Sequence, residues 1–314
     1  MTQALNGVLL DMATLGDDLN MAALQRLPVR WQCFDATAPE QVMSRIDGAQ
    51  VVLSNKVVLD AATIEAASQL EYIGVLATGT NNVDVDAALN GGITVRNVEG
   101  YGTASVAQHT LMLMLNLMRR YRHYQRAVDT GQWSRAEQFC LMDEPLRDLN
   151  DKHLVIVGYG ELGQEVARLA RAFDMKVSIA ARPGQPVSDG REALDTLLPE
   201  ADIVSLHCLL SEQTRQLINA QRLQRMKPSA VLINTARGGL IDELALADAL
   251  ASGTIGGAGL DVLSQEPPAA DHPLLRYRGD NLLITPHNAW ASQAARQRLL
   301  DIACQHVGDY LARR

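Results

Sequence analysis

The sequence has no surplus of basic residues. Its 314 residues include 28 Lys and Arg against 36 Asp and Glu, which gives a formal net charge of -8. Nucleic-acid binding requires a positively charged surface, and anionic membranes attract basic segments. The charge balance therefore argues against nucleic acid and against an acidic membrane surface as partners.

Long apolar runs are also missing. No segment reaches the roughly 20 apolar residues that span a bilayer. The most apolar helical stretch, 111–118, is interrupted by Asn116. The first residues carry acids and no basic cluster, so we expect neither a secretory signal peptide nor a membrane span.

Cysteine is scarce and scattered. Cys33, Cys140, Cys208 and Cys304 form no CxxC pair, so neither a zinc site nor a disulfide framework is expected. We interpret them as reduced thiols of a cytoplasmic protein that holds no metal. What the sequence does have is apolar content, with 47% hydrophobic residues over a length that suits two folded domains.

Short apolar runs alternate with helical patterns along the chain, which is typical of parallel sheets with crossover helices. Helices are expected at 61–70, at 103–124 and at 291–311, with a polar loop at 131–152. The expected strands of the first third are 51–54, 72–76 and 93–95. The expected strands of a second series are 154–157, 177–180, 203–206, 230–233, 258–261 and 282–284. Two such series predict two α/β domains.

A glycine-rich turn follows the first strand of the second series. Its sequence is Gly158-Tyr159-Gly160-Glu161-Leu162-Gly163, and an amphipathic helix and another strand come next. In a dinucleotide-binding fold the first glycine permits the tight turn, the second lets a pyrophosphate approach the backbone, and the third lets helix and strand pack closely. The N-terminus of the following helix attracts the phosphates. This context predicts a dinucleotide cofactor rather than an ordinary glycine-rich turn.

The end of the next strand bears on the choice between NAD(H) and NADP(H). An acidic residue about 20 positions after the glycines would accept hydrogen bonds from the adenosine ribose. Here the chain reads Ala181-Arg182-Pro183, and the next acid is Asp189. The guanidinium of Arg182 suits a 2′-phosphate, so we expect NADP(H) to be preferred, with NAD(H) possible. The alternative is that Arg182 is a solvated loop residue and the site is indifferent.

Polar residues follow three later strands, at the strand ends where α/β sheets bind ligands. Arg237 lies in the segment NTARGG, Glu266 in GLDVLSQEPP and His287 in TPHNAW. An arginine just before glycines at a strand end is well placed for a carboxylate. Taken singly, however, Arg237 could be a surface ion-pair residue, Glu266 a solvated loop acid and His287 a hydrogen-bonded strand-end histidine.

In this order after a nucleotide loop, the three segments resemble those of the D-isomer-specific 2-hydroxyacid dehydrogenases, and the resemblance covers nearly the whole chain. It implies that Arg237 binds the carboxylate and carbonyl of a 2-oxo acid, that His287 is the acid/base and that Glu266 orients His287. The physics agrees, because hydride delivery builds negative charge on the carbonyl oxygen, which an imidazolium and a guanidinium can stabilise. A neighbouring carboxylate favours the charged imidazole.

The resemblance also implies further binding residues. Asp261 would contact the nicotinamide carboxamide. On the substrate side, the backbone N–H groups of Thr78 and Gly79 would hold the carboxylate, with Asn55 and Lys56 at the tip of a second loop. Lys56 could instead be a solvated turn residue. Besides the glycine loop, the other implied cofactor contacts are Ala181, Arg182, Pro183, His207, Cys208, Thr214, Thr235, Ala236 and Ala289.

The fold that the resemblance implies has two Rossmann-like, doubly wound parallel-sheet domains, with the cofactor domain inserted in a flavodoxin-like substrate domain. Residues 1–100 and 288–314 would form the substrate domain, and 101–287 the dinucleotide-binding domain. A dimerisation element near 104–150 implies a homodimer, although its apolar content alone could equally be core. His109 is interpreted as a helix residue near the domain junction rather than a catalyst.

Within the family, SNKVVL, ATGTNNVDV, GTASVAQHT and TPHNAW look most like the glycerate dehydrogenase/hydroxypyruvate reductase branch. The expected activity is reduction of hydroxypyruvate or glyoxylate to D-glycerate or glycolate, and the reverse reaction. The alternatives are another D-2-hydroxyacid dehydrogenase, of D-lactate or phosphoglycerate type, and a non-catalytic dinucleotide-sensing binding protein. Retention of Arg237, Glu266 and His287 favours an enzyme.

Overall fold

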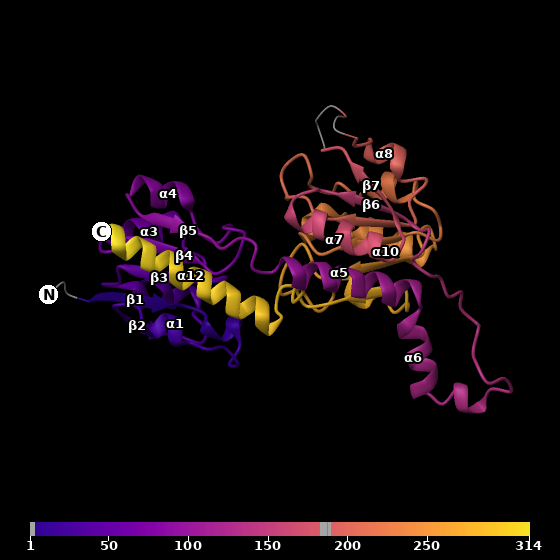
Figure 1. The fold of residues 1–314 in the computed structure, drawn as a ribbon, viewed down its shortest axis with the longest axis horizontal. Coiled ribbons are helices and arrows are strands. Elements are labelled where there is room, and N and C mark those ends of the chain that lie inside the picture. The colour runs from indigo at the N-terminus through magenta and orange to yellow at the C-terminus, as the bar shows by residue number, and fades with distance from the viewer. Residues whose placement is uncertain (1–3, 183–186, 188–189) are drawn as a thin grey trace. The chain divides into compact units, whose positions relative to one another are not determined.

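The computed structural model describes residues 4–182, 187 and 190–314. The chain forms two compact units, of which unit 1 consists of residues 1–102 and 290–314 and unit 2 of residues 103–289. Each unit has its own parallel sheet (Figure 1). Buried hydrophobic side chains form a core on each face of each sheet. The predicted fold class, two doubly wound α/β domains with one inserted in the other, is confirmed.

Unit 1 contains a five-stranded parallel sheet in the order β2-β1-β3-β4-β5. This is the flavodoxin-like order, and its direction of winding reverses between β1 and β3. The strands are β1 (Leu5–Leu9), β2 (Val29–Cys33), β3 (Val51–Ser54), β4 (Tyr72–Val75) and β5 (Thr94–Arg96).

Two of these strands, β1 and β2, are absent from the sequence-based prediction. Asn6 and Gly7 in β1 disfavour a strand, and in the edge strand β2 only Val29 is buried. Pairing with neighbours fixes both strands, since Gly7 pairs with Trp31 on one side and with Val51 on the other.

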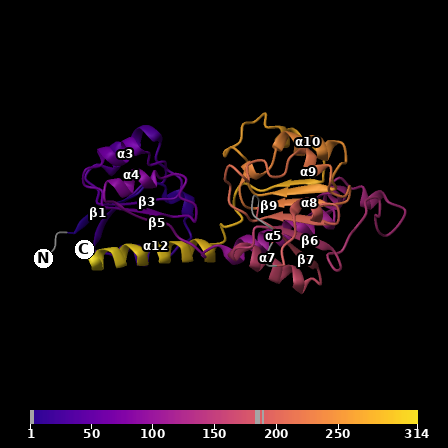
Figure 2. The ribbon, with the colours of Figure 1, turned by 90° about the horizontal axis from the view of Figure 1, so that it is seen from above.

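Helices cover both faces of the unit 1 sheet. The short helices α2, α3 and α4 pack on one face, and α1 and the long C-terminal helix α12 cover the other (Figure 2). Successive strand residues alternate between the two cores, so Val51 and Leu53 contact the α12 side and Val52 the opposite side. The helical elements are η1 (Met12–Leu15), α1 (Ala22–Gln25), η2 (Pro39–Gln41), α2 (Val42–Ile46), α3 (Ala61–Ala66), α4 (Val85–Asn90) and α12 (Gln293–Arg313).

Unit 2 contains a six-stranded parallel sheet in the order β11-β10-β9-β8-β6-β7. A parallel bridge between Ala180 and Glu192 adds one residue beyond β7, in the place of the third strand of a Rossmann sheet. The winding reverses between β6 and β8, which is the position where such sheets bind nucleotides. The strands are β6 (His153–Val157), β7 (Lys176–Ala180), β8 (Ile203–Leu206), β9 (Val231–Asn234), β10 (Gly257–Leu260) and β11 (Leu282–Ile284).

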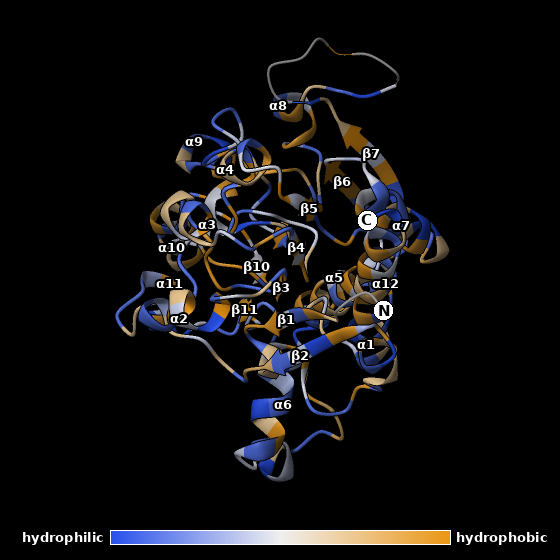
Figure 3. Cartoon of the chain, turned by 90° about the vertical axis from the view of Figure 1, so that its left-hand side faces the viewer, coloured by the Kyte–Doolittle hydropathy of each residue, from blue (hydrophilic) through white to orange (hydrophobic). Residues whose placement is uncertain are grey.

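Two helical layers enclose this sheet. Helices α5 and α7 pack on one face and the shorter helices α8 to α11 on the other (Figure 2). The apolar strands β6 and β7 are orange in the hydropathy colouring of Figure 3. The helical elements are α5 (Thr103–Met118), α7 (Glu161–Ala172), α8 (Leu194–Leu197), α9 (Ala220–Leu223), η4 (Gly238–Leu240), α10 (Glu243–Ala251) and α11 (Pro273–Arg276).

The helix expected over 103–124 is two helices. Arg120 has a left-handed backbone, with φ of 51°, and this separates α5 from α6 (Tyr121–Asp129). Helix α6 and the following chain, with η3 (Trp133–Arg135), project from the body of unit 2 (Figure 1). Within the described ranges, no helix is both long enough and apolar enough to cross a bilayer.

Candidate active site

The strand register of unit 2 brings the predicted site segments to one sheet edge. The last residues of the six strands are paired from strand to strand, and because the strands are parallel all six carboxyl ends lie along the same edge. These residues are Ala180, Val157, Leu206, Asn234, Leu260 and Ile284. The glycine loop, Arg182, His207, Thr235, Asp261 and Thr285 follow them within two residues.

The three glycines of the loop after β6 meet different surroundings. Gly158 has a φ of +96°, and a Cβ there would lie 2.5 Å from the backbone N of Cys208. A Cβ on Gly163 would lie 2.2 Å from the Gly158 carbonyl oxygen, whereas one on Gly160 would meet no atom within 4 Å. The protein's own packing therefore requires the first and third glycines. The second faces open space at the start of α7, which fits the approach of a pyrophosphate.

The residues between these glycines also have defined places. Glu161 is the first residue of α7, and its carboxylate accepts a hydrogen bond of 2.6 Å from Thr103 Oγ1 at the start of α5. Tyr159 packs against the core beneath α5 and α7, and Leu162 is half-buried. The loop is thus held by α5 as well as by its own strand and helix.

At the end of β7, the structure places an arginine where many dinucleotide sites have an acid. The Ala181 backbone N donates to the Glu192 carbonyl over 2.7 Å, which completes the short third-strand position. Arg182 is exposed. Pro183, the next predicted contact, lies outside the described residues.

The segment after β8 contains a neutral histidine. Burial lowers the pKa of His207 to about 4, and its Nε2 lies 2.8 Å from Ser205 Oγ. Its Nδ1 is buried and has no hydrogen-bond partner among the residues that are described. Burial raises the pKa of the neighbouring Cys208 thiol to about 11, so this thiol is not poised as a nucleophile. The buried Thr214 hydroxyl donates to the Leu209 carbonyl over 2.7 Å and so holds its own loop.

The loop after β9 carries Arg237 on a buried asparagine. Asn234 accepts a hydrogen bond of 3.0 Å from the Ala236 N–H, and its amide donates to the Arg237 carbonyl over 2.9 Å. The Thr235 hydroxyl lies 3.0 Å from that of Thr110 on α5. These contacts fix the backbone on both sides of Arg237, whose side chain is half-buried.

Gly238 brings the Arg237 loop against the segment that carries Glu266. A Cβ at position 238 would lie 1.9 Å from the Leu263 carbonyl carbon and 2.2 Å from the Ser264 N. No side chain fits there, so the two loops are in direct backbone contact. Two motifs that are separate in the sequence thereby become one structure.

Glu266 and His287 form a hydrogen-bonded pair. Glu266 Oε1 accepts a hydrogen bond of 2.8 Å from the Leu263 N–H, and its Oε2 is bonded to His287 Nδ1. His287 itself has a φ of 50°, in the left-handed region, and its backbone N donates to the Asp261 carbonyl over 2.8 Å. The acid is thus fixed by its own loop and in turn orients the imidazole.

Asp261 is buried, with 2% of its surface exposed, and its carboxylate accepts backbone N–H groups of the loop after β11. The N–H of Asn288 lies 3.0 Å from Oδ1 and that of Ala289 lies 2.9 Å from Oδ2. Two predicted cofactor contacts, Asp261 and Ala289, are therefore joined directly. This structural role of Asp261 has no signal in the sequence.

The predicted substrate residues of unit 1 lie after two adjacent strands, because Ser54 at the end of β3 pairs with Val75 at the end of β4. Asn55 is buried, and its amide donates to Thr14 Oγ1 over 3.0 Å. Lys56 is exposed. In the second loop, the Thr78 hydroxyl donates to the Val98 carbonyl over 3.1 Å, and Gly79 is half-buried.

Sequence reasoning missed Asp11, which holds the loop of Asn55 and Lys56. This carboxylate follows β1, is 4% exposed, and accepts the backbone N–H groups of Asn55 at 2.9 Å, Lys56 at 2.6 Å and Val57 at 3.2 Å. The only signal in the sequence is an acid directly after the apolar run Val8–Leu10. Asp11 and Lys56 also line a cavity of about 630 Å³ within unit 1.

Comparison with known proteins agrees with this geometry. The family model described as D-isomer specific 2-hydroxyacid dehydrogenase, NAD binding domain, matches residues 111–289. Glycerate dehydrogenase of Methylorubrum extorquens is 42% identical over 287 residues, which cover 91% of this chain and 90% of that protein. Hydroxypyruvate reductase of Blautia hydrogenotrophica is 39% identical over 279 residues, covering 88% and 86%. The structure of an acyclic imino acid reductase in complex with NADPH and D-Arg matches with a TM-score of 0.86 at 27% identity, covering 98% and 97%.

Proposed function

Since the chain belongs to the D-isomer-specific 2-hydroxyacid dehydrogenase family and is thus a nicotinamide-dependent oxidoreductase, we propose that it reduces hydroxypyruvate or glyoxylate to D-glycerate or glycolate and catalyses the reverse reaction. The observation that carries the proposal is the bond between Glu266 Oε2 and His287 Nδ1. It lies at the sheet edge that also holds the glycine loop and Arg237. The names of the two relatives support the choice of substrates.

In this proposal His287 is the acid/base. The nicotinamide, when bound, supplies or accepts the hydride. His287 gives a proton to the carbonyl oxygen during reduction and takes it back from the hydroxyl during oxidation. Because Nδ1 is bonded to Glu266, we assign the proton transfer to Nε2. The Glu266 carboxylate stabilises the imidazolium and fixes the plane of the ring.

Arg237 is proposed to bind the 2-oxo acid. A guanidinium presents a planar fork of donors that matches a carboxylate, and its charge stabilises an oxygen that becomes negative. The Asn234 side chain holds the backbone around Arg237, and Arg237 Nη1 donates to the Ala236 carbonyl over 2.7 Å, which supports a fixed position for the guanidinium. From unit 1 we propose the backbone N–H groups of Thr78 and Gly79 and the side chain of Lys56 as further substrate contacts. Asn55 would act through its loop, because its amide is bonded to Thr14.

NADP(H) is proposed as the preferred cofactor. The glycine loop, with open space at Gly160, would hold the pyrophosphate. An exposed Arg182 at the end of β7 supports a contact with a 2′-phosphate, and a structural neighbour is described with NADPH. The other proposed contacts are Tyr159, Glu161, Leu162, Ala181, His207, Cys208, Thr214, Thr235, Ala236, Asp261 and Ala289.

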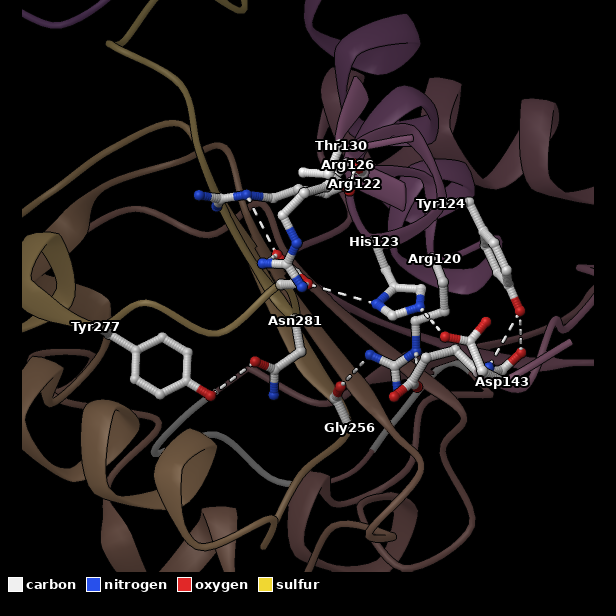
Figure 4. Close-up of polar contacts among 12 residues, drawn as sticks. Arg120, Arg122, His123, Tyr124, Arg126, Thr130, Asp143, Gly256, Tyr277 and Asn281 are labelled. Atoms are coloured by element: carbon white, nitrogen blue, oxygen red, sulfur yellow. Dashed lines mark hydrogen bonds and ion pairs between the residues drawn. The ribbon is translucent and has the colours of Figure 1, made fainter. Parts of the chain in front are cut away.

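A homodimer through the element near 104–150 also remains a proposal. Figure 4 shows Arg120, His123 and Arg126 at the base of α6. His123 Nε2 lies 2.8 Å from Asp143 Oδ2, and Arg126 Nη1 donates to Asp280 Oδ1 over 2.8 Å. Six large apolar side chains within residues 121–146 are exposed, which is typical of an interface. They are Tyr121, Val128, Trp133, Phe139, Met142 and Leu146.

Light scattering tests the proposed homodimer. It should give the dimer mass for the wild type and the monomer mass for the double variant Phe139→Ser/Met142→Ser. A monomeric wild type would contradict the proposal.

The test of function is a panel of 2-oxo acids with NADPH and NADH. We expect the highest kcat/KM with hydroxypyruvate or glyoxylate and NADPH, and a D-configured product from hydroxypyruvate. Arg182→Ala should lower kcat/KM with NADPH and leave that with NADH nearly unchanged, whereas Arg171→Ala, an exposed arginine on α7, serves as the matched control. Binding of the dinucleotide without turnover of any 2-oxo acid would favour the non-catalytic alternative.

A further inference from the structure

The loop after β11, residues 285–289, carries His287 and is held at both ends by residues of other elements. At its start, the Thr285 hydroxyl lies 2.6 Å from Asp261 Oδ1 and 2.9 Å from His109 Nε2. At its end, the Ser105 hydroxyl donates to the Ala289 carbonyl over 2.6 Å. These bonds add to the two backbone N–H groups that the Asp261 carboxylate accepts.

The hydrogen bonds at Thr285 can run in only one direction. The Asp261 carboxylate only accepts, and so does the Leu260 carbonyl, which lies 3.5 Å from the hydroxyl. The single hydroxyl proton is therefore given to an acceptor, and Thr285 Oγ1 must accept from His109 Nε2–H. Burial lowers the pKa of His109, an effect that the Asp261 carboxylate opposes, so a neutral ring with its proton on Nε2 fits this chain.

Ser105 and His109 are four residues apart on α5 and so lie on one face of the helix. That face meets both ends of the loop, at Ala289 and at Thr285. The middle of the loop bends through the left-handed backbone of His287, which is unfavourable for a residue with a side chain. The hydrogen bonds at both ends of the loop stabilise this unfavourable backbone conformation.

We propose that Thr285, His109 and Ser105 are positioning residues, which hold loop 285–289 so that His287 meets Glu266 in the orientation for proton transfer. The inference rests on the proposed function, because it assumes that His287 is the acid/base. It gives His109 a role other than catalysis, since its Nε2–H is used by Thr285. Helix α5 would then have two roles, because it packs in the core and also holds the catalytic loop.

Thr285 offers a matched pair of variants. Thr285→Val removes the hydroxyl and keeps the shape, whereas Thr285→Ser keeps the hydroxyl. A small displacement of an acid/base slows proton transfer, so Thr285→Val should lower kcat for hydroxypyruvate about 10- to 100-fold. The Kd of NADPH for this variant should stay within about 2-fold of the wild-type value. The kcat of Thr285→Ser should stay within about 3-fold of the wild-type kcat. Thr130→Val, the same change at the end of α6, is the control and should leave kcat unchanged. A Thr285→Val enzyme with wild-type kcat, or a folded Thr285→Ser enzyme as slow as Thr285→Val, would overturn the proposal.

His109 offers a second pair. His109→Gln keeps an N–H donor at a similar reach and should retain more of the wild-type kcat than His109→Leu, with the KM of the keto acid similar in both. Ser105→Ala should have a smaller effect, because Asp261 still holds the Ala289 N–H. If His109→Leu is folded and has the kcat of the wild type, His109 is not a positioning residue.

Amide hydrogen exchange of the peptide that spans 285–289 tests the same idea without turnover. Exchange should be faster in Thr285→Val than in the wild type and in Thr285→Ser. Equal exchange in all three overturns the inference. A wild type that reduces no 2-oxo acid overturns the proposed function instead, and faster exchange in Thr285→Val would then still show that these residues hold the loop.

Discussion

Both units place one buried aspartate at the carboxyl edge of their sheet, and each aspartate holds the loop that follows a neighbouring strand. In unit 1, Asp11 after β1 accepts three successive backbone N–H groups of the loop after β3. In unit 2, Asp261 after β10 accepts two backbone N–H groups and a hydroxyl of the loop after β11. The same device thus supports the proposed substrate loop in one unit and the proposed catalytic loop in the other.

The two devices differ in how far their partners reach along the chain. Asp11 and its loop are 44 to 46 residues apart, and the donors to its carboxylate are backbone groups. The loop of unit 2 also depends on α5, since His109 and Thr285 are 176 residues apart and Ser105 and Ala289 are 184 apart. The proposed catalytic loop therefore needs most of unit 2 to be folded, whereas the unit 1 loop needs two adjacent strands.

The largest effect is expected on kcat, when the proposed acid/base of unit 2 is replaced and compared with a proposed substrate-binding residue of unit 1. His287→Gln removes the proposed acid/base and should lower kcat for hydroxypyruvate by about 10²- to 10⁴-fold. Lys56→Gln, in the loop held by Asp11, should raise the KM of the keto acid and change kcat little, because it removes a binding charge. Steady-state kinetics with saturating NADPH gives both parameters. An equal loss of kcat in both variants would mean that the chemistry does not reside in unit 2 alone.

A smaller effect is expected when the Asp11 carboxylate, which holds the loop after β3 in unit 1, is replaced. Asp11→Asn keeps the shape but turns one acceptor into a donor that faces backbone N–H groups, which should lower the free energy of unfolding by about 1–3 kcal/mol. The KM of the keto acid should rise as the loop loosens. Urea unfolding measures the stability, with Asp35→Asn, an exposed aspartate that lines the same cavity, as the control. Equal stability of Asp11→Asn and the control would show that the hydrogen bonds from the three backbone N–H groups to Asp11 contribute little to the free energy of unfolding.

The smallest effect is a difference in acid sensitivity. In unit 2, burial lowers the pKa of His207 from 6.5 to about 4, so between these pH values the unfolded chain binds more protons and the folded unit loses stability as the pH falls. His109 shifts in the same direction, through burial. In unit 1, the Arg296 side chain holds the pKa of Asp18 below its usual 3.8, so that contribution is lost only at lower pH.

Calorimetry at pH 7 and pH 5 tests this difference. Wild-type protein should melt at a lower temperature at pH 5, and His207→Gln should narrow the gap between the two melting temperatures. Asp18→Asn is the control and should leave the gap unchanged, because Asp18 is ionised at both pH values. A gap that His207→Gln does not narrow would mean that another group dominates the acid sensitivity.

Much of the fold was predictable because its signals are local. The strand, glycine loop and helix over 153–172 follow from an apolar run, three glycines and a helical period, all within 20 residues. The left-handed break at Arg120 was not predictable, because no glycine or proline between residues 103 and 129 marks it in the sequence. Strands β1 and β2 were missed for the opposite reason, since pairing rather than composition defines them.

The candidate site divides in the same way. The chemical groups can be read from the chain, since a guanidinium, a carboxylate and an imidazole follow successive strands in that order. Folding adds contacts that the order of residues does not contain: Gly238 admits the Leu263 backbone, Asn55 is buried, and four polar residues hold the loops that carry the proposed site. These four are Asp11, Asp261, Ser105 and His109. The two kinds of information differ in their range along the chain. Periodicity and turn chemistry act over a few residues, whereas these contacts join positions from 25 to 184 residues apart, which meet only when the sheets have formed.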